Sequence, residues 1–343
     1  MKTFPAAQQI KVGVVGYGGA FNMGKAHLTE MQKAGMSPCA VAEIDPARLA
    51  VAQQDFPGIE TYSSLDTMLR KSAVNLVTII TPHNTHARLA LTALRAGRHV
   101  VCEKPLAITT AECDAMITAA RQSRVVLSTY HNRHWDGRVM QAVEDVVHKR
   151  CIGDIVRIEA HMGGRGKPGD WWRSSKSISG GILYDWGVHL LEYSLQLVRS
   201  DIVEVTGFAK KGYWAPHTKW KTDTNEDEGY AVVRFQNGVV LTLCVTQLDS
   251  NPKRGWVELV GTEGNYILDG PQNEFIRRDG TTTTITTSKR VDEGWKFYQN
   301  IADHLTGKAK LVITPEWSRR PIHILDLADR SAKAGKTLRA KYA

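Results

Sequence analysis

The stretch Lys11-Val12-Gly13-Val14-Val15-Gly16-Tyr17-Gly18-Gly19 decides the fold of the N-terminal part of the chain. It begins as a short apolar run, which predicts a buried strand, and it ends in closely spaced glycines. Apolar residues at helical spacing follow through Met31 and stop at Ala34-Gly35, a typical helix end. A strand, a glycine turn and a helix in this order are the context that a dinucleotide-binding fingerprint requires.

The spacing of these glycines departs from the usual G-x-G-x-x-G pattern. Gly16 and Gly18 fit it, but the next glycine in register before the helix is Gly24, so the loop is three residues longer. Such glycines let the backbone approach a pyrophosphate, and the helix N-terminus behind them offers free N–H groups. A tight turn without a ligand is the alternative for the loop alone. The residues expected to face the nucleotide are Gly16, Gly18, Gly19, Ala20 and Phe21.

A second apolar run, Cys39–Ala42, ends in Glu43, which lies 19 residues after Gly24. A carboxylate at the end of the second strand can accept hydrogen bonds from the ribose hydroxyls of NAD, and it would repel the 2′-phosphate of NADP. A solvated acid at a strand end is the alternative. Strand, loop, helix and acid together predict that the cofactor is NAD, with NADP less favoured.

Strands and helices continue to alternate through the first 134 residues. Apolar, often β-branched runs cover residues 74–80, 99–102 and 125–130, and residues 87–96 carry apolar side chains at helical spacing. Strands separated by amphipathic helices predict right-handed βαβ units and a parallel sheet. We therefore predict an α/β Rossmann domain over residues 1–134.

Two short segments follow strands of this domain, at the edge where open α/β sheets bind ligands. A lysine in Glu103-Lys104-Pro105 can donate to a substrate hydroxyl and stabilise a developing alkoxide, although a Glu-Lys pair on a surface turn is the alternative. His86 can face the nicotinamide, but a lone histidine is more often structural. The candidate cofactor residues at this edge are Thr81, Pro82, His86, Glu103 and Lys104.

The pattern changes after about Trp135. A helix is predicted over residues 138–148, and strands then dominate. They are expected at Ile155–His161, Tyr230–Phe235, Val239–Val245, Trp256–Val260, Tyr266–Leu268, Glu274–Arg277 and Thr281–Thr286. Asn237-Gly238 is a strong two-residue hairpin signal. An α+β domain with a large, mostly antiparallel sheet is predicted over residues 135–343, with C-terminal helices that can pack back on the first domain.

Asp185, His189 and Glu192 are spaced i, i+4 and i+7, which predicts one helical face. A histidine flanked by carboxylates gains basicity and a fixed tautomer, as a general base needs. A satisfied histidine on a polar helix face is an equally supported interpretation, and metal ligation is less favoured. The preceding loop, residues 163–173, can lie over a polyol or form a subunit contact. The candidate substrate residues are Arg165, Trp172, Arg173, Asp185 and His189.

Composition excludes several classes of protein. The 343 residues suggest roughly two domains, and 42% hydrophobic with 23% charged residues is ordinary globular usage. The net charge of +9 comes from scattered basic residues, so no nucleic acid partner is expected. The chain shows no signal-peptide pattern and no apolar run of membrane-spanning length, which predicts a cytoplasmic protein. Five cysteines without a C-x-x-C pair indicate reduced thiols and no zinc site.

Taken in order, these segments resemble the Gfo/Idh/MocA family, the glucose–fructose oxidoreductases and inositol dehydrogenases, over nearly the whole chain. Residues 93–106 are similar to the family's A-L-x-A-G-K-H-V-x-x-E-K-P-L signature almost position for position. Thr81-Pro82 followed by His86 is similar to its T-P-x-x-x-H segment. Gly180-Gly181 and the D-x-x-x-H spacing that follows resemble a third family segment.

The resemblance implies a Rossmann domain followed by a mostly antiparallel sheet domain that often makes subunit contacts. It implies a catalytic trio of Lys104, Asp185 and His189, in which the histidine is the base and the lysine positions and polarises the reacting oxygen. Two departures are the longer glycine loop at residues 19–23 and Glu192, where family members often carry aspartate.

The resemblance implies an NAD-dependent oxidoreductase that converts a secondary hydroxyl of a sugar, polyol or sugar derivative to a ketone, or the reverse. A homodimer or homotetramer is expected. Two alternatives stay open: an NAD-dependent glycosidase that oxidises a sugar transiently, and a catalytically silent NAD-sensing module. A metal-dependent lyase or hydrolase is less favoured.

Overall fold

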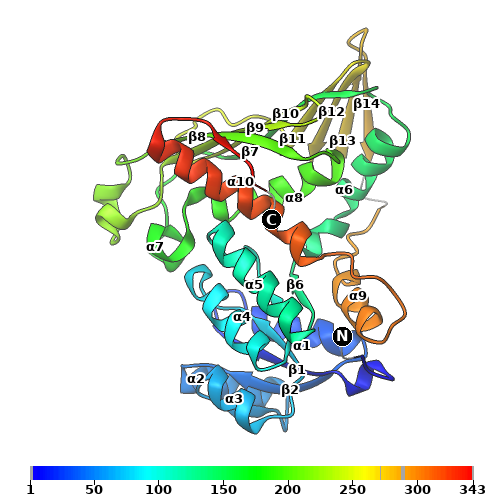
Figure 1. The fold of residues 1–343 in the computed structure, drawn as a ribbon. Helices are drawn as coiled ribbons and strands as arrows, with labels where there is room; N and C mark the ends of the chain where they lie inside the picture. Colours follow the sequence, from blue (N-terminus) through cyan, green and yellow to red (C-terminus); the bar gives the residue numbers. More distant parts are fainter. Residues whose placement is uncertain (1–2, 271, 287–289, 342–343) are drawn as a thin grey trace. The chain divides into compact units, whose positions relative to one another are not determined.

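The computed structural model describes residues 3–270, 272–286 and 290–341 (Figure 1). Close packing of the backbone divides the chain into two compact units. The first unit holds residues 1–131 and 295–319, and the second holds residues 132–294 and 320–343. The chain therefore leaves the first unit after His131 and returns to it for a short C-terminal segment.

Over the described residues, the first unit contains a six-stranded parallel sheet in the order β3-β2-β1-β4-β5-β6. Its strands are β1 (Lys11–Val15), β2 (Ser37–Ala42), β3 (Glu60–Tyr62), β4 (Leu76–Ile79), β5 (His99–Cys102) and β6 (Leu127–Thr129). The strand order reverses between β1 and β4, which is where doubly wound sheets bind dinucleotides. The predicted Rossmann fold is confirmed.

Helices lie between or next to these strands in the chain, except for the last, which belongs to the C-terminal segment that returns to the first unit. They are α1 (Met23–Lys33), α2 (Pro46–Asp55), α3 (Leu65–Lys71), α4 (His86–Arg95), α5 (Thr110–Ser123) and α9 (Lys296–Leu305), with short 3-10 turns at Ala7–Gln9 and His83–Thr85. Asp45 caps α2 by accepting the Ala47 N–H at 2.9 Å, and Thr109 with Glu112 forms a capping box on α5. These two caps fix where α2 and α5 begin.

The second unit is built on a nine-stranded sheet within the described ranges, in the order β14-β13-β12-β11-β7-β10-β9-β8-β15. Its strands are β7 (Ile155–Gly163), β8 (Ile202–Lys210), β9 (Glu228–Phe235), β10 (Val240–Thr246), β11 (Val257–Gly261), β12 (Gly264–Asp269), β13 (Gln272–Arg277), β14 (Thr282–Thr286) and β15 (Leu338–Arg339). Neighbouring strands are antiparallel except for the parallel pair β7 and β10. The predicted mostly antiparallel sheet is confirmed, including the hairpin at Asn237-Gly238.

Helices of the second unit lie on one face of this sheet (Figure 1). They are α6 (Gly137–Ala142), continued by a π-helix at Val143–His148, α7 (Lys176–Ser179), α8 (Gly187–Leu197) and α10 (Pro315–Ala334). Shorter 3-10 turns lie at Asn132–Trp135, Trp172–Ser174, Ile182–Tyr184, Ala215–His217 and Lys221–Asp223. Helix α10 packs directly on β8, because a Cβ on Gly207 would lie 2.0 Å from the carbonyl oxygen of Ala328.

The five cysteines all fall within the described ranges and are free thiols. No group of three or more His, Cys, Asp or Glu side chains suited to hold a metal ion occurs in the described part of the chain. None of the helices seen there combines the length and apolarity needed to cross a bilayer.

Candidate active site

Two glycines of the β1–α1 loop are required by the packing of the chain itself. Gly16 has φ +100°, and a Cβ there would lie 2.6 Å from the carbonyl oxygen of Ile80. Gly24 lies in α1, where a Cβ would approach the Tyr17 ring to 2.4 Å and the Gly16 carbonyl oxygen to 3.1 Å. The first glycine therefore makes the tight turn, and the last one lets the helix pack closely against the strand end.

Gly18, between them, is not required by the protein. Its φ is not positive, and among the described residues no atom lies within 4 Å of a Cβ built on it. The backbone from Gly18 to Asn22 is exposed, and α1 begins directly behind it at Met23. This open glycine in front of a helix N-terminus is the cradle that a pyrophosphate fills in dinucleotide-binding folds, so the loop fits the expected cofactor despite its extra length.

Glu43 is fixed at the end of β2, next to the same loop. Its Oε2 accepts the backbone N–H of Tyr17 at 2.6 Å, and its Oε1 accepts those of Ile44 and Asp45 at 2.7 and 3.1 Å. Since each carboxylate oxygen has two lone pairs, Glu43 keeps capacity to accept a ribose hydroxyl.

Arg48, which sequence reasoning missed, flanks the loop from helix α2. Its Nε donates to the Tyr17 carbonyl at 2.8 Å, and its Nη1 would lie 3.2 Å from a Cβ on Gly19. An arginine in this part of a Rossmann fold can accommodate the 2′-phosphate of NADP. Two side chains next to the glycine loop are therefore each suited to one cofactor, Glu43 to NAD and Arg48 to NADP.

The Glu103-Lys104-Pro105 segment follows β5, and its glutamate is held from inside the unit. Glu103 Oε1 lies 3.1 Å from Nε2 of the fully buried His27, and Oε2 accepts the Lys104 N–H at 2.8 Å. Burial alone would raise the pKa of Glu103, but the bond to His27 and the nearby Lys104 charge lower it. Glu103 is therefore an ionised anchor for the strand end from which the half-buried Lys104 extends, with the Lys104–Pro105 peptide in the cis form.

His86, the first residue of α4, braces the same edge of the sheet. Its Nδ1 lies 2.8 Å from the Pro105 carbonyl oxygen, and its Nε2 lies 2.8 Å from that of Thr81. The ring is fully buried, and this burial lowers the pKa of His86 despite the two carbonyl contacts. A neutral imidazole carries one N–H, so one of these two contacts is a hydrogen bond, and the ring links the Thr81 and Pro105 segments. The predicted contact of His86 with a nicotinamide stays a prediction.

In the second unit, Asp185 does not share a regular helix with His189, contrary to the predicted helical face. The 3-10 turn Ile182–Tyr184 ends at Asp185, and α8 begins only at Gly187. His189 is buried, with its ring 5.6 Å from the Trp186 ring. The Gly180-Gly181 turn, with both φ angles positive, precedes this segment, and the change from the 3-10 turn to α8 between Asp185 and Gly187 breaks the helical period.

Glu192, the third member of the predicted face, has a partner that the sequence did not indicate. It is 1% exposed, and its Oε1 lies 2.6 Å from Nδ1 of His134, which comes from the turn after the first unit. The Gln196 amide also donates to Glu192 at 3.1 Å. The carboxylate is thus committed to structural contacts on α8, which accounts for the burial of an acid in an otherwise apolar helix.

Asp185 forms an ion pair with Arg173, so two of the predicted substrate residues are brought together. The Arg173 guanidinium also lies 5.2 and 5.1 Å from the ring centroids of Trp171 and Trp172. Stacking and pairing fix the guanidinium in one place, and they hold the Asp185 carboxylate at the wall of a pocket.

This pocket has a volume of about 390 Å³ and is lined by the loop from Met162 to Gly169 and by the segment around Asp185. Arg165, Arg173 and Asp185 of the predicted substrate set belong to its lining, and Trp171 lines it in the place predicted for Trp172. Its volume falls in the range of small-molecule sites, and its wall combines tryptophans with charged groups.

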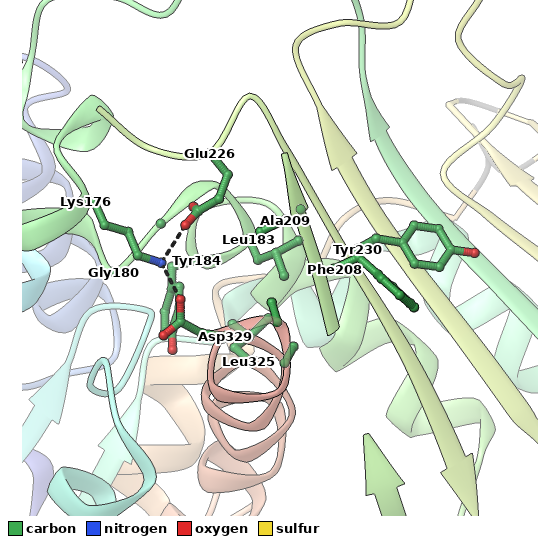
Figure 2. Close-up of a pocket in the computed structure, with 14 residues that line it drawn as sticks. Lys176, Gly180, Leu183, Tyr184, Phe208, Ala209, Glu226, Tyr230, Leu325 and Asp329 are labelled. Carbon is green, nitrogen blue, oxygen red and sulfur yellow. Dashed lines mark hydrogen bonds and ion pairs between the residues drawn. The ribbon is translucent and has the colours of Figure 1, made fainter. Parts of the chain in front are cut away.

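A buried ionic cluster supports the turn that leads to Asp185 (Figure 2). The ammonium of Lys176 lies 2.8 Å from both Glu226 Oε1 and Asp329 Oδ1, and Glu226 Oε2 accepts the Ile182 N–H at 3.1 Å. A Cβ on Gly181, whose φ is +127°, would lie 2.6 Å from both Lys176 Nζ and Glu226 Oε2. The cluster therefore fills the space beside the glycine turn and fixes the backbone there.

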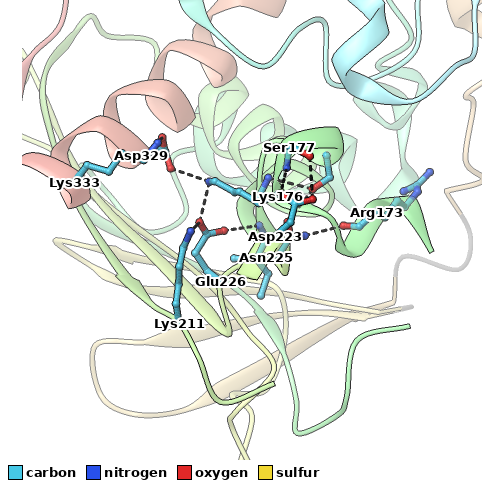
Figure 3. Close-up of polar contacts among 12 residues, drawn as sticks. Arg173, Lys176, Ser177, Lys211, Asp223, Asn225, Glu226, Asp329 and Lys333 are labelled. Atoms are coloured by element: carbon cyan, nitrogen blue, oxygen red, sulfur yellow. Dashed lines mark hydrogen bonds and ion pairs between the residues drawn. The ribbon is translucent and has the colours of Figure 1, made fainter. Parts of the chain in front are cut away.

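The same cluster continues toward Arg173 (Figure 3). Asn225, next to Glu226, donates from Nδ2 to the Arg173 carbonyl at 2.7 Å. Asp223 accepts the Ser177 N–H at 3.0 Å and so ties down the first turn of α7. Sequence reasoning missed this support, which connects the segment before β9 and helix α10 to the two residues at the pocket wall.

The open glycine cradle, the strand-end acid and the second sheet unit define a two-domain NAD-binding oxidoreductase. The family model described as "Oxidoreductase family, NAD-binding Rossmann fold" matches residues 10–131, and the "GFO/IDH/MocA C-terminal domain" matches residues 140–267. The chain belongs to the Gfo/Idh/MocA family, as its resemblance to the family's signatures predicted.

Individual relatives match most of the chain. It is 29% identical to scyllo-inositol 2-dehydrogenase (NADP(+)) IolW of Bacillus subtilis, over 97% of this chain and 96% of that protein. It is 26% identical to levoglucosan dehydrogenase of Pseudarthrobacter phenanthrenivorans, over 84% and 80%. The crystal structure of an NAD-binding protein from Listeria innocua is similar with a TM-score of 0.79 and 27% identity, over 97% of each chain.

Proposed function

We propose that the protein is a dehydrogenase that oxidises a secondary hydroxyl of a sugar, polyol or sugar derivative to a ketone, or catalyses the reverse reaction, with NAD as the preferred cofactor. The observation that carries the proposal is the pocket beside Asp185, whose volume of about 390 Å³ suits a monosaccharide with a substituent. Relatives named for inositol and levoglucosan support the same class of substrate.

In the proposed mechanism, His189 removes the hydroxyl proton as general base. Lys104 donates a hydrogen bond to the same oxygen and stabilises the alkoxide as it forms. Asp185, held by Arg173, orients the hydroxyl and the base. When bound, NAD supplies the nicotinamide C4 that accepts the hydride. Gly16, Gly18, Gly19, Ala20, Phe21 and Glu43 hold the nucleotide, and Glu103 and His86 position the edge that carries Lys104.

We also infer that the protein is a cytoplasmic homodimer or homotetramer. Five free thiols suit a reducing compartment. The exposed ring of Phe208 on the second unit is the kind of surface that subunit contacts cover.

A screen of sugars and polyols with NAD and NADP tests the proposed reaction. We expect net reduction of the nucleotide by at least one compound, faster with NAD than with NADP because Glu43 repels a 2′-phosphate. Cleavage of a glycoside without net reduction would indicate the glycosidase alternative, and NAD binding without turnover would indicate the sensing module. A higher kcat/KM with NADP would show that Arg48 outweighs Glu43 in cofactor choice.

Alanine substitutions separate the two kinds of glycine in the nucleotide loop. Gly18→Ala should leave the melting temperature unchanged, because a methyl group meets no atom of the described chain, but it should weaken NAD binding about tenfold by holding the pyrophosphate away. Gly16→Ala should destabilise the protein by about 2 kcal/mol, because φ +100° and the Ile80 carbonyl both oppose a side chain. Thermal unfolding and NAD titration of both variants provide the measurements. An unchanged NAD affinity in Gly18→Ala would remove this loop from the cofactor site.

A further inference from the structure

The pocket beside Asp185 carries an excess of positive charge. Its described lining contains one carboxylate, that of Asp185, and three cationic side chains, those of Arg165, Lys167 and Arg173. The Arg173 and Asp185 charges are paired with each other, and Lys167 has the Asp170 carboxylate at 3.5 Å. Arg165 is the remaining cation, and no carboxylate of the described chain pairs with it.

Arg165 is nevertheless held in place by a neutral partner. Its Nη2 donates to the Tyr213 hydroxyl at 2.7 Å, and its guanidinium lies 5.4 Å from the centroid of the Tyr213 ring. The backbone of Arg165 forms an isolated antiparallel bridge with Leu248, which follows β10. Arg165 is an exposed residue, and these contacts restrain its main chain and use one of the five N–H donors of its guanidinium.

The support for Arg165 reaches into the core of the unit. The backbone N–H groups of Tyr213 and Trp214 donate to the two carboxylate oxygens of Asp227, at 2.7 and 2.9 Å. Asp227 is 1% exposed, and the Trp214 indole donates to the Gln247 carbonyl at 3.1 Å. A buried acid thus fixes the tyrosine that orients the arginine.

This arrangement suits an anionic group more than a neutral hydroxyl. The guanidinium has five N–H donors in a planar fork that matches carboxylate and phosphate oxygens, and the Tyr213 hydroxyl accepts only from one nitrogen. A solvated surface arginine is the ordinary alternative, but it does not explain why the side chain is fixed at the wall of a pocket shared with Asp185.

We propose that the substrate is an anionic sugar or polyol, with a carboxylate or phosphate that Arg165 binds while Asp185 faces the hydroxyl to be oxidised. This inference rests on the proposed dehydrogenase function. A pocket of about 390 Å³ holds a monosaccharide together with such a group. The lining thus offers two kinds of group, the mutually neutralised Arg173–Asp185 pair and the uncompensated Arg165, one for each part of the substrate.

Matched pairs of compounds test the charge requirement. Glucuronate against glucose and galacturonate against galactose probe a carboxylate, and glucose 6-phosphate against glucose probes a phosphate. Turnover is measured with NAD, and calorimetric titration of the NAD-saturated protein gives the affinity for each compound. We expect at least one anion to bind, and to be oxidised, tenfold or more better than its neutral partner.

Variants assign this preference to one side chain. Arg165→Gln should raise KM for the preferred anion about ten- to hundredfold, and it should raise KM for the neutral partner at least tenfold less than that. Arg165→Lys, which keeps the charge but loses the fork, should show an intermediate KM. Arg278→Gln, at an arginine with 80% of its side chain exposed, is the matched control and should behave as wild type.

The outcomes distinguish this inference from the proposed function. Neutral sugars oxidised as well as their anionic partners would overturn the anionic class and leave the dehydrogenase in place. If no compound reduces NAD, the result contradicts the proposed dehydrogenase function. The calorimetric affinities then still test whether the pocket prefers anionic compounds. Equal affinity within every pair, or equal affinity of wild type and Arg165→Gln for the anion, would overturn it.

Discussion

Replacing Lys104 or His189 by alanine should lower kcat by about 10²–10⁴-fold while NAD still binds. Lys104 would lose the ammonium that stabilises the developing alkoxide, and His189 would lose the imidazole that takes the proton. The glycine cradle and Glu43 are built from other residues of the first unit, so the affinity for NAD should remain near that of wild type. Steady-state turnover and NAD titration measure the two effects separately.

Additional variants guard against a structural explanation of this loss. His189 is buried, so His189→Gln, which preserves hydrogen-bonding capacity and much of the side-chain volume, should fold normally and remain inactive. Lys71→Ala and His148→Gln, both at exposed positions, are matched controls and should keep wild-type turnover. Turnover that persists in both Lys104→Ala and His189→Ala would show that these side chains do not carry the chemistry.

The fold could be predicted where local pattern and tertiary structure agree. The glycine loop, the strands β4 and β5 and the Asn237-Gly238 hairpin each have a strong signal within ten residues of sequence. Strand β8 (Ile202–Lys210) has no such signal, because Gly207 interrupts it. Gly207 is required because the Ala328 carbonyl of α10 leaves no room for a Cβ. The two residues are far apart in the sequence, so a local sequence pattern cannot predict their contact.

The site shows the same division. The motif residues Lys104, Asp185 and His189 lie next to strand ends or glycine turns, which the sequence marks. Their supporting residues do not: Glu103 is anchored by His27, and the acid predicted to flank His189 contacts His134. Such pairs depend on which side chains tertiary packing brings together, and neither spacing nor composition specifies them.

The Lys176 cluster is the strongest case of this kind, and Lys176→Met should reduce the free energy of unfolding by about 3 kcal/mol at pH 7. The substitution removes the ammonium between Glu226 and Asp329, and it leaves the Glu226 carboxylate, which is 6% exposed, with Lys211 and the Ile182 N–H as remaining partners. Lys211 still lies 3.2 Å from Glu226, and Lys333 still lies 2.6 Å from Asp329. The expected loss of stability is therefore at the low end of the range for breaking a buried ion pair. Chemical denaturation measures the effect.

Activity should fall in the same variant, because the cluster supports the pocket wall. Glu226 holds the Ile182 N–H next to the Gly181 turn, and the adjacent Asn225 holds the Arg173 carbonyl. A shift of this backbone displaces Asp185 relative to the base, which should lower kcat about tenfold or more. Lys308→Met, at an exposed lysine of the first unit, should change neither stability nor turnover.

The difference in stability between wild type and Lys176→Met should narrow as the pH falls. In the wild type, burial tends to raise the pKa of Glu226, but Lys176 outweighs it and the net pKa lies below the ordinary value. A carboxylate with a lowered pKa stabilises the folded state above its unfolded pKa of about 4.3, and this stabilisation is lost as the pH falls through the folded value. Without the Lys176 charge, burial is opposed by fewer groups, among them Lys211 and the Ile182 N–H, so the pKa of Glu226 should rise and acid should destabilise the variant less than the wild type. The difference in unfolding free energy between wild type and Lys176→Met should therefore be smaller at about pH 4 than at pH 7. An equal difference at both pH values would mean that the lysine acts by packing and not by its charge.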